Sequence, residues 1–137
     1  MKKIALLGFG VVGKGVYDII AKRNDMEVAR VLVRRSIEEI AAISTDKIDD
    51  IVGDPAIDTV VEVMGGVHPA YEYIAAALSA GKNVVTANKA VISACYKELT
   101  ALAAEKGLAL RCTAAVGGGI PWLINLERCR RIDTVTE

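Results

Sequence analysis

The sequence predicts an α/β fold built on a doubly wound parallel sheet. Short apolar segments rich in Val, Ile and Leu alternate with segments of helical spacing along the chain. Strands separated by helices pair in parallel through right-handed crossovers. The composition suits a sheet buried on both faces, because 53% of the 137 residues are hydrophobic and only 4% are aromatic.

The chain opens with a strand and a helix. Lys3–Leu7 is a continuous apolar run, which predicts a buried strand. Val11–Arg23 follows with apolar residues at helical spacing. The apolar face of this helix comprises Val12, Val16, Ile19 and Ile20.

Two strands and two short helices come next. Ser36 and Glu39 have the spacing of a capping box. Thr45 or Asp46 is expected to cap the following helix, and Gly53 to end it. The predicted strands are Val28–Val33 and Ile43–Ser44, and the predicted helices are Ser36–Ala42 and Lys47–Val52.

The second half continues the alternation. Pro69 suits a first helical position, Ser93 suits an N-cap, and Gly81 and Gly107 suit helix ends. The predicted strands are Thr59–Val63, Asn83–Thr86 and Leu108–Thr113, and the predicted helices are Pro69–Ser79, Ser93–Lys106 and Pro121–Arg130. The expected strand order is 3-2-1-4-5-6, in which ligands bind beyond the carboxyl ends of the strands.

A glycine-rich turn, Gly8-Phe9-Gly10-Val11-Val12-Gly13, joins the first strand to the first helix. Backbone N–H groups and the positive end of the helix favour a pyrophosphate there. Gly8 permits the tight turn, Gly10 leaves room for the phosphates, and Gly13 lets the helix pack close to the strand. The turn predicts a Rossmann-type dinucleotide-binding fold in which these six residues contact the cofactor. A purely structural turn is the alternative.

The end of the second strand indicates which dinucleotide is bound. NAD-binding proteins usually carry an acidic residue here, but this chain has Val33-Arg34-Arg35 and no Asp or Glu between Val28 and Ile37. Guanidinium groups attract the 2′-phosphate of NADP. We expect NADP(H) as the preferred cofactor and NAD(H) as the second choice, with Arg34 as the main contact and Arg35 as a helper. Two solvated surface arginines are the alternative.

Composition argues against other classes of partner. The formal net charge is zero, which does not favour nucleic acid or an anionic membrane. No run approaches the ~20 apolar residues that span a bilayer. The cysteines Cys95, Cys112 and Cys129 form no CxxC pair, so neither disulfides nor a metal site are predicted. A cytoplasmic location is expected.

Four motifs, in order, resemble homoserine dehydrogenases. They are the glycine turn continued by Lys14-Gly15, the segment Asp58–Gly66 with Pro69-Ala70 after it, Thr86-Ala87-Asn88-Lys89-Ala90, and Ala114–Pro121. The resemblance covers essentially the whole chain and implies an NAD(P)-binding Rossmann domain over residues 1–137. It also implies an enzyme that reduces aspartate semialdehyde to homoserine, for threonine and methionine biosynthesis.

The resemblance implies further cofactor contacts at Gly65, Gly66, Thr86, Asn88 and Lys89. The Thr86 hydroxyl is expected to bond the nicotinamide carboxamide or ribose. Lys89, the candidate catalytic residue, would bring a cation near the carbonyl oxygen that gains negative charge. An ordinary lysine in a loop is the alternative.

The chain also departs from the family. Thr113 stands where the family has a Glu that helps to bind a monovalent cation, so no bound metal is predicted. The chain stops at Glu137, where the substrate domain begins in the family, so the main catalytic residues are expected beyond it. Residues 120–137 would start the connection to that domain.

The final helix carries many apolar residues for a lone domain: Ile120, Trp122, Leu123, Ile124 and Leu126. They predict a missing partner surface or a homo-oligomer, unless the helix folds back over the sheet edge. Two other functions stay open: a non-catalytic nucleotide-sensing module, and another NAD(P)-dependent dehydrogenase of an amino-acid pathway.

Overall fold

A computed structural model describes residues 1–116 and 122–131. In chain order, the elements are β1 (Lys2–Leu7), α1 (Val11–Ile20), β2 (Met26–Leu32), the 3-10 helix η1 (Glu38–Ile40), β3 (Ser44–Thr45), α2 (Asp49–Val52), β4 (Ile57–Glu62), α3 (Ala70–Ser79), β5 (Asn83–Thr86), α4 (Lys89–Lys106), β6 (Leu110–Arg111), the 3-10 helix η2 (Thr113–Ala115) and α5 (Trp122–Arg130).

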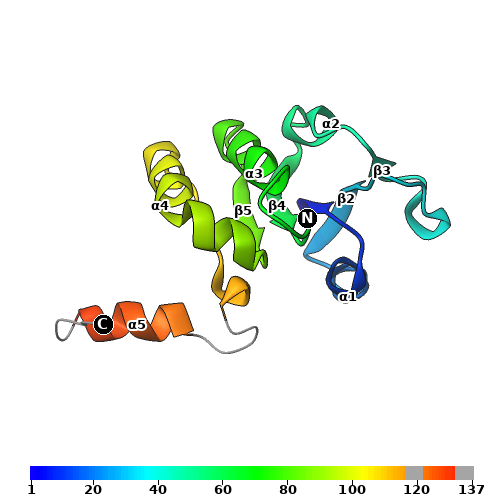
Figure 1. Ribbon diagram of the computed structural model, residues 1–137. Helices are drawn as coiled ribbons and strands as arrows, with labels where there is room; N and C mark the ends of the chain where they lie inside the picture. The colour runs from blue at the N-terminus through cyan, green and yellow to red at the C-terminus, as the bar shows by residue number, and fades with distance from the viewer. Residues whose placement is uncertain (117–121, 132–137) are drawn as a thin grey trace.

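The strands form one parallel sheet in the order β3-β2-β1-β4-β5-β6, which confirms the predicted fold class and topology (Figure 1). The direction of winding reverses between β1 and β4. In sheets of this kind, a crevice for ligands opens at the carboxyl ends of those two strands.

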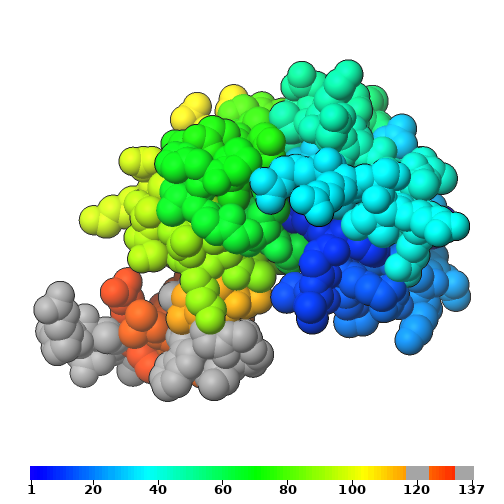
Figure 2. Space-filling model, turned by 45° about the vertical axis from the view of Figure 1, so that its right-hand side comes forward, coloured from blue at the N-terminus to red at the C-terminus, as the bar shows by residue number. Residues whose placement is uncertain are grey.

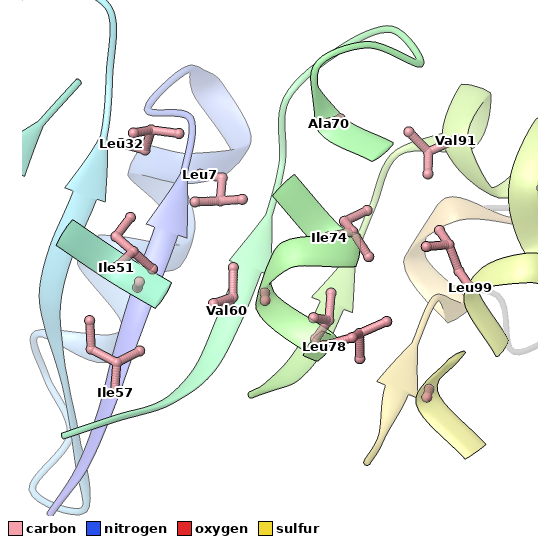
Figure 3. Close-up of a cluster of buried hydrophobic side chains, with 14 residues drawn as sticks. Leu7, Leu32, Ile51, Ile57, Val60, Ala70, Ile74, Leu78, Val91 and Leu99 are labelled. Carbon is pink, nitrogen blue, oxygen red and sulfur yellow. The ribbon is translucent and has the colours of Figure 1, made fainter. Parts of the chain in front are cut away.

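Helices cover both faces of the sheet because successive residues of β1 point to opposite sides. Ala5 and Leu7 belong to the larger core, which lies under α2, α3 and α4 (Figure 3). Leu6 lies on the other face and packs with Val31 of β2 and with residues of α1. The labelled members of the larger core in Figure 3 are Leu7, Leu32, Ile51, Ile57, Val60, Ala70, Ile74, Leu78, Val91 and Leu99.

The predicted apolar face of α1 is wrong in part. Val12 and Ile19 are 55% and 65% exposed, whereas Gly13 and Ile20 are buried. The side facing the core carries Gly13, Val16, Tyr17 and Ile20, and it is rotated by roughly 60° from the predicted face. Apolar spacing alone did not reveal this rotation, because apolar residues occupy more than one side of the helix. The helix also ends at Ile20 rather than at Arg23.

The region after β2 is less helical than predicted. The expected helix Ser36–Ala42 is a short 3-10 helix, η1, whose N-cap is Ile37, so the capping box does not form. Glu39 instead accepts hydrogen bonds from Lys14 Nζ at 2.6 and 2.8 Å, an interaction that pairs η1 with α1. The third strand is shifted by one residue, to Ser44–Thr45.

The N-caps of two later helices also differ from those predicted. The N-cap of α2 is Ile48, not Thr45 or Asp46, although Gly53 ends the helix as expected. The helical run α4 begins at Lys89 and has a kink at Cys95, whose φ of -128° and ψ of 16° are not helical. Ser93 therefore lies two residues before the kink rather than at the start of a helix. The side chain of Asn88 caps α4 by accepting a hydrogen bond from the backbone N–H of Val91 at 3.2 Å.

The strand boundaries in the second half agree with the sequence prediction to different extents. Strand β5 begins and ends at the predicted residues, whereas β4 is displaced by one or two residues toward the N-terminus. Strand β6 is only Leu110–Arg111 because it pairs with a single neighbour at the sheet edge. Helix α3 starts at Ala70, with Pro69 as its N-cap, and ends at Ser79 as predicted.

Helix α5 contacts η2 and lies away from the main body of the sheet (Figure 1). Ile124 and Leu126 are exposed, so this helix does not bury them over the sheet edge. The expectations for residues 117–121, and for the side chains of Trp122 and Leu123, lie outside the described residues. No helix within residues 1–116 and 122–131 is long and apolar enough to cross a membrane.

Candidate functional site

The glycine turn has the geometry that its sequence predicts. Gly8 follows β1 with a φ of 99°, a conformation that residues with a side chain rarely adopt. A Cβ on Gly13 would lie 2.4 Å from the carbonyl oxygen of Gly8, so only glycine allows this close approach. A Cβ on Gly10 would meet no atom within 4 Å, and Gly10 is the N-cap of α1 without a side-chain cap. The first N–H groups of α1 are therefore available to an anion.

A cavity of about 750 Å³ opens beside this turn. It lies at the carboxyl ends of β1, β2 and β4, where the strand order reverses. In Figure 2, the cyan segment after β2 lies next to the green surface of the β4–α3 region and above the blue N-terminal region. The cavity is lined by Gly8, Phe9, Gly10, Leu32, Val33, Arg34, Arg35, Ile37, Asp46, Val63, Met64, Gly65, His68, Pro69 and Tyr73.

The cavity brings together only part of the predicted site. From the expected cofactor contacts, its lining includes Gly8, Phe9, Gly10, Arg34, Arg35 and Gly65. The others lie outside the lining: Val11, Val12, Gly13, Gly66, Thr86, Asn88 and Lys89. Three of these belong to α1, and the other four lie in the loop after β4 or between the last residue of β5 and the first residue of α4. Strands β4 and β5 are on the other side of β1 from β2, which the arginines follow.

Arg34 and Arg35 follow β2 after one intervening residue, Val33, and are both exposed. Within the described part of the chain, neither guanidinium lies in an ion pair. Both therefore bring a positive charge to the cavity lining without a direct ion-pair partner in the described residues. This is the arrangement in which a phosphate group is bound most strongly.

Asp46 is a carboxylate in the lining of the same cavity that the sequence pattern does not point to. The acidic residue of NAD-binding proteins is expected near the end of the second strand. Asp46 comes later, directly after β3, but β3 pairs with β2 and so places Asp46 at the same edge of the sheet. The predicted third strand was the signal that could have revealed it.

The ends of β4 and β5 are joined by a buried polar network centred on Glu62. Oε2 of Glu62 accepts a hydrogen bond from Thr86 Oγ1 at 2.5 Å. Oε1 accepts from the backbone N–H of Met64 at 2.7 Å and from Asn88 Nδ2 at 3.3 Å. Burial raises the pKa of Glu62, and the bonds from Thr86, Met64 and Asn88 oppose that rise in part.

This network changes the role expected of Thr86. Its hydroxyl is fully buried, donates to Glu62, and accepts a hydrogen bond from the backbone N–H of Asn88 at 3.0 Å. The hydroxyl is thus engaged by protein groups on both sides. Its bond to a nicotinamide or ribose stays a prediction. Lys89 is exposed at the first residue of α4, so its ammonium is accessible to a ligand.

Thr113, which stands where the family has a cation-binding Glu, lies in η2. Over residues 1–116 and 122–131, no three His, Cys, Asp or Glu side chains form a group able to hold a metal ion.

Comparison with known proteins identifies the family. Residues 8–112 match the model described as the NAD-binding domain of homoserine dehydrogenase. The homoserine dehydrogenase of Bacillus subtilis (strain 168) is 36% identical over 149 residues, which cover 98% of this chain and 34% of that protein. That of Synechocystis sp. is 40% identical, over 92% of this chain and 32% of that protein.

Solved structures agree with these matches. A crystal structure of a homoserine dehydrogenase from Thiobacillus denitrificans aligns with a TM-score of 0.82 at 34% identity, over 96% of this chain and 34% of that one. A homoserine dehydrogenase from S. aureus aligns with a TM-score of 0.78 at 36% identity, over 87% of this chain and 33% of that one. The chain spans about a third of the length of these relatives. By sequence and by structure, it belongs to the family of homoserine dehydrogenase NAD-binding domains.

Proposed function

We propose that this chain is the NADP(H)-binding portion of a homoserine dehydrogenase, which interconverts aspartate semialdehyde and homoserine by hydride transfer. One observation carries the choice of cofactor. The same cavity contains the glycine turn before α1 and the two arginines after β2. The turn suits a pyrophosphate, and the arginines suit a phosphate on the adenosine ribose. The family relationship supports the reaction.

The residues present fit such a dinucleotide. The space beside Gly10 is open, so backbone and phosphate can approach closely. The cavity volume falls in the range of small-molecule sites. Phe9, Val33, Ile37 and Pro69 give part of the lining an apolar character that suits a nucleoside.

We assign the following roles to the residues of the chain. The turn Gly8–Gly13 and the N-terminus of α1 hold the pyrophosphate, and Arg34, helped by Arg35, holds the 2′-phosphate. The loops that contain Gly65, Gly66, Thr86, Asn88 and Lys89 surround the nicotinamide half. The bound nicotinamide supplies the hydride chemistry.

Lys89 has an electrostatic role in this proposal. Its exposed ammonium, at the start of α4, lies near the reacting carbonyl and stabilises the negative charge that develops on its oxygen. The main catalytic residues belong to the part of the relatives that this chain does not span. We therefore expect the chain to bind the cofactor without turning over substrate.

The direct test is a calorimetric titration of the purified chain with NADPH and NADH, followed by an aspartate-semialdehyde reduction assay. Binding without turnover is the expected result. Failure of the folded chain to bind either nucleotide would overturn the proposed function. Turnover by the chain alone would show that the catalytic groups lie within it.

Arg34 provides the test of cofactor preference. Arg34→Ala should weaken NADPH binding by about tenfold or more, the scale of a lost hydrogen bond to a charged group, and leave NADH binding within about twofold. Arg111→Ala is the matched control, because Arg111 is exposed on β6 and outside the cavity. Equal losses for the two nucleotides would refute the assignment.

A further inference from the structure

Glu62 is fully buried at the end of β4 and has no cation beside it within the described residues. Burial of a lone carboxylate is costly unless hydrogen bonds compensate for it. Three donors do so: the Thr86 hydroxyl, the backbone N–H of Met64 and the side-chain amide of Asn88. An apolar residue here would leave these three donors without an acceptor.

The donor and acceptor of each hydrogen bond in this network are fixed. Asn88 uses its Oδ1 to accept from the N–H of Val91, so its Nδ2 must face Glu62. Thr86 Oγ1 accepts from the N–H of Asn88, so its hydroxyl hydrogen is directed to Glu62. Every group around Glu62 is therefore a donor, and only a carboxylate has acceptors for all of them.

The bonds of Glu62 reach both loops that we assign to the nicotinamide half. Through Met64, Glu62 fixes the loop after β4, and Met64 Cγ would lie 3.3 Å from a Cβ on Gly8 in the glycine turn. Asn88 Nδ2 also donates to the carbonyl oxygen of Gly66 at 2.7 Å, which ties that loop to the start of α4. Lys89 is the next residue along the chain.

We propose that Glu62 is a positioning residue of the dinucleotide site, whose carboxylate holds the Met64–Gly66 and Thr86–Lys89 loops in the arrangement that receives the nicotinamide half. It makes no contact with the cofactor itself. The inference rests on the proposed function, because it assumes that a dinucleotide binds across the glycine turn. To the proposed site it adds Glu62, a residue that acts through both loops at once.

The test compares a whole dinucleotide with its adenosine half. The folded chain and its Glu62→Gln variant are titrated with NADPH and with adenosine 2′,5′-bisphosphate, which contacts only the adenosine side. Glutamine keeps the shape but has one acceptor oxygen in place of two, so the hydrogen of the Thr86 hydroxyl loses its acceptor. NADPH binding should weaken about tenfold, while binding of the bisphosphate should change less than twofold.

Lys82→Met is the matched control for general damage. Lys82 is also buried, at the opposite end of the sheet, and its Nζ donates to the carbonyl oxygens of Asp54 and Ile57 at 2.7 and 2.9 Å. This variant should lose stability and yet keep the wild-type ratio of the two affinities. If Lys82→Met lowers the ratio as much as Glu62→Gln does, the effect is general and the positioning role is refuted.

A second pair of variants keeps the test decisive if Glu62→Gln does not fold. Thr86→Val removes the hydroxyl that donates to Glu62, whereas Thr86→Ser retains it. The valine variant should lose NADPH affinity selectively, and the serine variant should lose less of it than the valine variant. Equal ratios in wild type and variants would overturn the inference alone, whereas a wild-type chain that binds neither ligand would overturn the proposed function.

Discussion

At the scale of single residues, the cavity contains opposing charges. Arg34 and Arg35 attract a 2′-phosphate, while the carboxylate of Asp46 repels it. Among residues 1–116 and 122–131, Asp46 forms no ion pair with either arginine. The preference for NADP(H) in our proposal therefore depends on a balance in which the two cations outweigh one exposed anion.

Replacement of Asp46 should shift this balance. Asp46→Asn should strengthen NADPH binding by about two- to fivefold at low salt, because one repulsive charge near the 2′-phosphate is removed. NADH binding should not improve, and the gain should shrink as ionic strength rises. Fluorescence titrations at two salt concentrations measure both effects; an equal gain for NADH would contradict the explanation.

Glu62 should leave a signature in the pH dependence of stability. Burial raises its pKa in the folded state, so the folded chain holds this proton at pH values where the unfolded chain has released it. Its contribution to the free energy of unfolding is therefore most favourable below the usual glutamate pKa, about 4.3, and is lost as pH rises through the raised pKa.

The measurement is urea unfolding of wild type and Glu62→Gln at a series of pH values from about 4 to 8. The wild-type stability should fall relative to that of the variant as pH rises across this window. Other titrating groups cancel in the difference because both proteins contain them. Parallel stability curves would show that the Glu62 pKa is not raised.

The role of a site residue can be predicted from the sequence where its neighbours along the chain determine that role. Gly8 and Gly13 were recognised because one local turn requires both. Asp46 and Glu62 were missed as site residues because their roles depend on which strands are adjacent. The sequence does not show directly that β3 lies beside β2, or that a hydroxyl at the last residue of β5 faces a carboxylate at the last residue of β4.

At the scale of elements, helix α1 offers a matched pair of glycines. A Cβ on Gly13 would lie 2.4 Å from the backbone oxygen of Gly8, whereas a Cβ on the exposed Gly15 would meet nothing within 4 Å. Gly13→Ala should destabilise the chain by about 2 kcal/mol or more, because the backbone of the turn must move. Gly15→Ala should stabilise it by about 0.5–1 kcal/mol through helix propensity.

Urea unfolding of the two variants measures these free energies, and NADPH titration adds a second comparison. Gly13→Ala should also weaken NADPH binding, since it displaces the turn, and Gly15→Ala should not. Similar stabilities for the two variants would mean that α1 can move away from the turn at little cost.

The helix boundaries show how contacts between elements modify local preferences. Ser36 and Glu39 have the right spacing for a capping box, but Glu39 pairs with Lys14 of α1 instead. Ser93 is a good N-cap residue in isolation, yet α4 starts at Lys89 because Asn88 already caps it from within the Glu62 network. Strand β5, which is buried between two neighbours, needed no such correction.

At the scale of the whole molecule, apolar surface is left uncovered on several elements. Val11 and Ile19 on α1, Val85 on β5, and Ile124 and Leu126 on α5 are all large exposed hydrophobic residues. Alternation along β5 places Val85 on the face opposite to Val84, which is in the core under α3 and α4. The face of the sheet that α1 shares is thus less fully covered than the other face.

We expect this surface to drive reversible self-association of the chain as its concentration rises, because exposed apolar groups are removed from water in the contact. Sedimentation velocity over a wide range of concentrations should show an increasing weight-average sedimentation coefficient. Ile19→Lys should reduce the increase without loss of stability, since Ile19 is 65% exposed and its replacement leaves the core intact. Lys22→Glu, at another exposed site near the end of α1, is the control for a change of charge alone. A single sedimentation coefficient at all concentrations would show that the exposed residues are too dispersed to form a contact between copies of the chain.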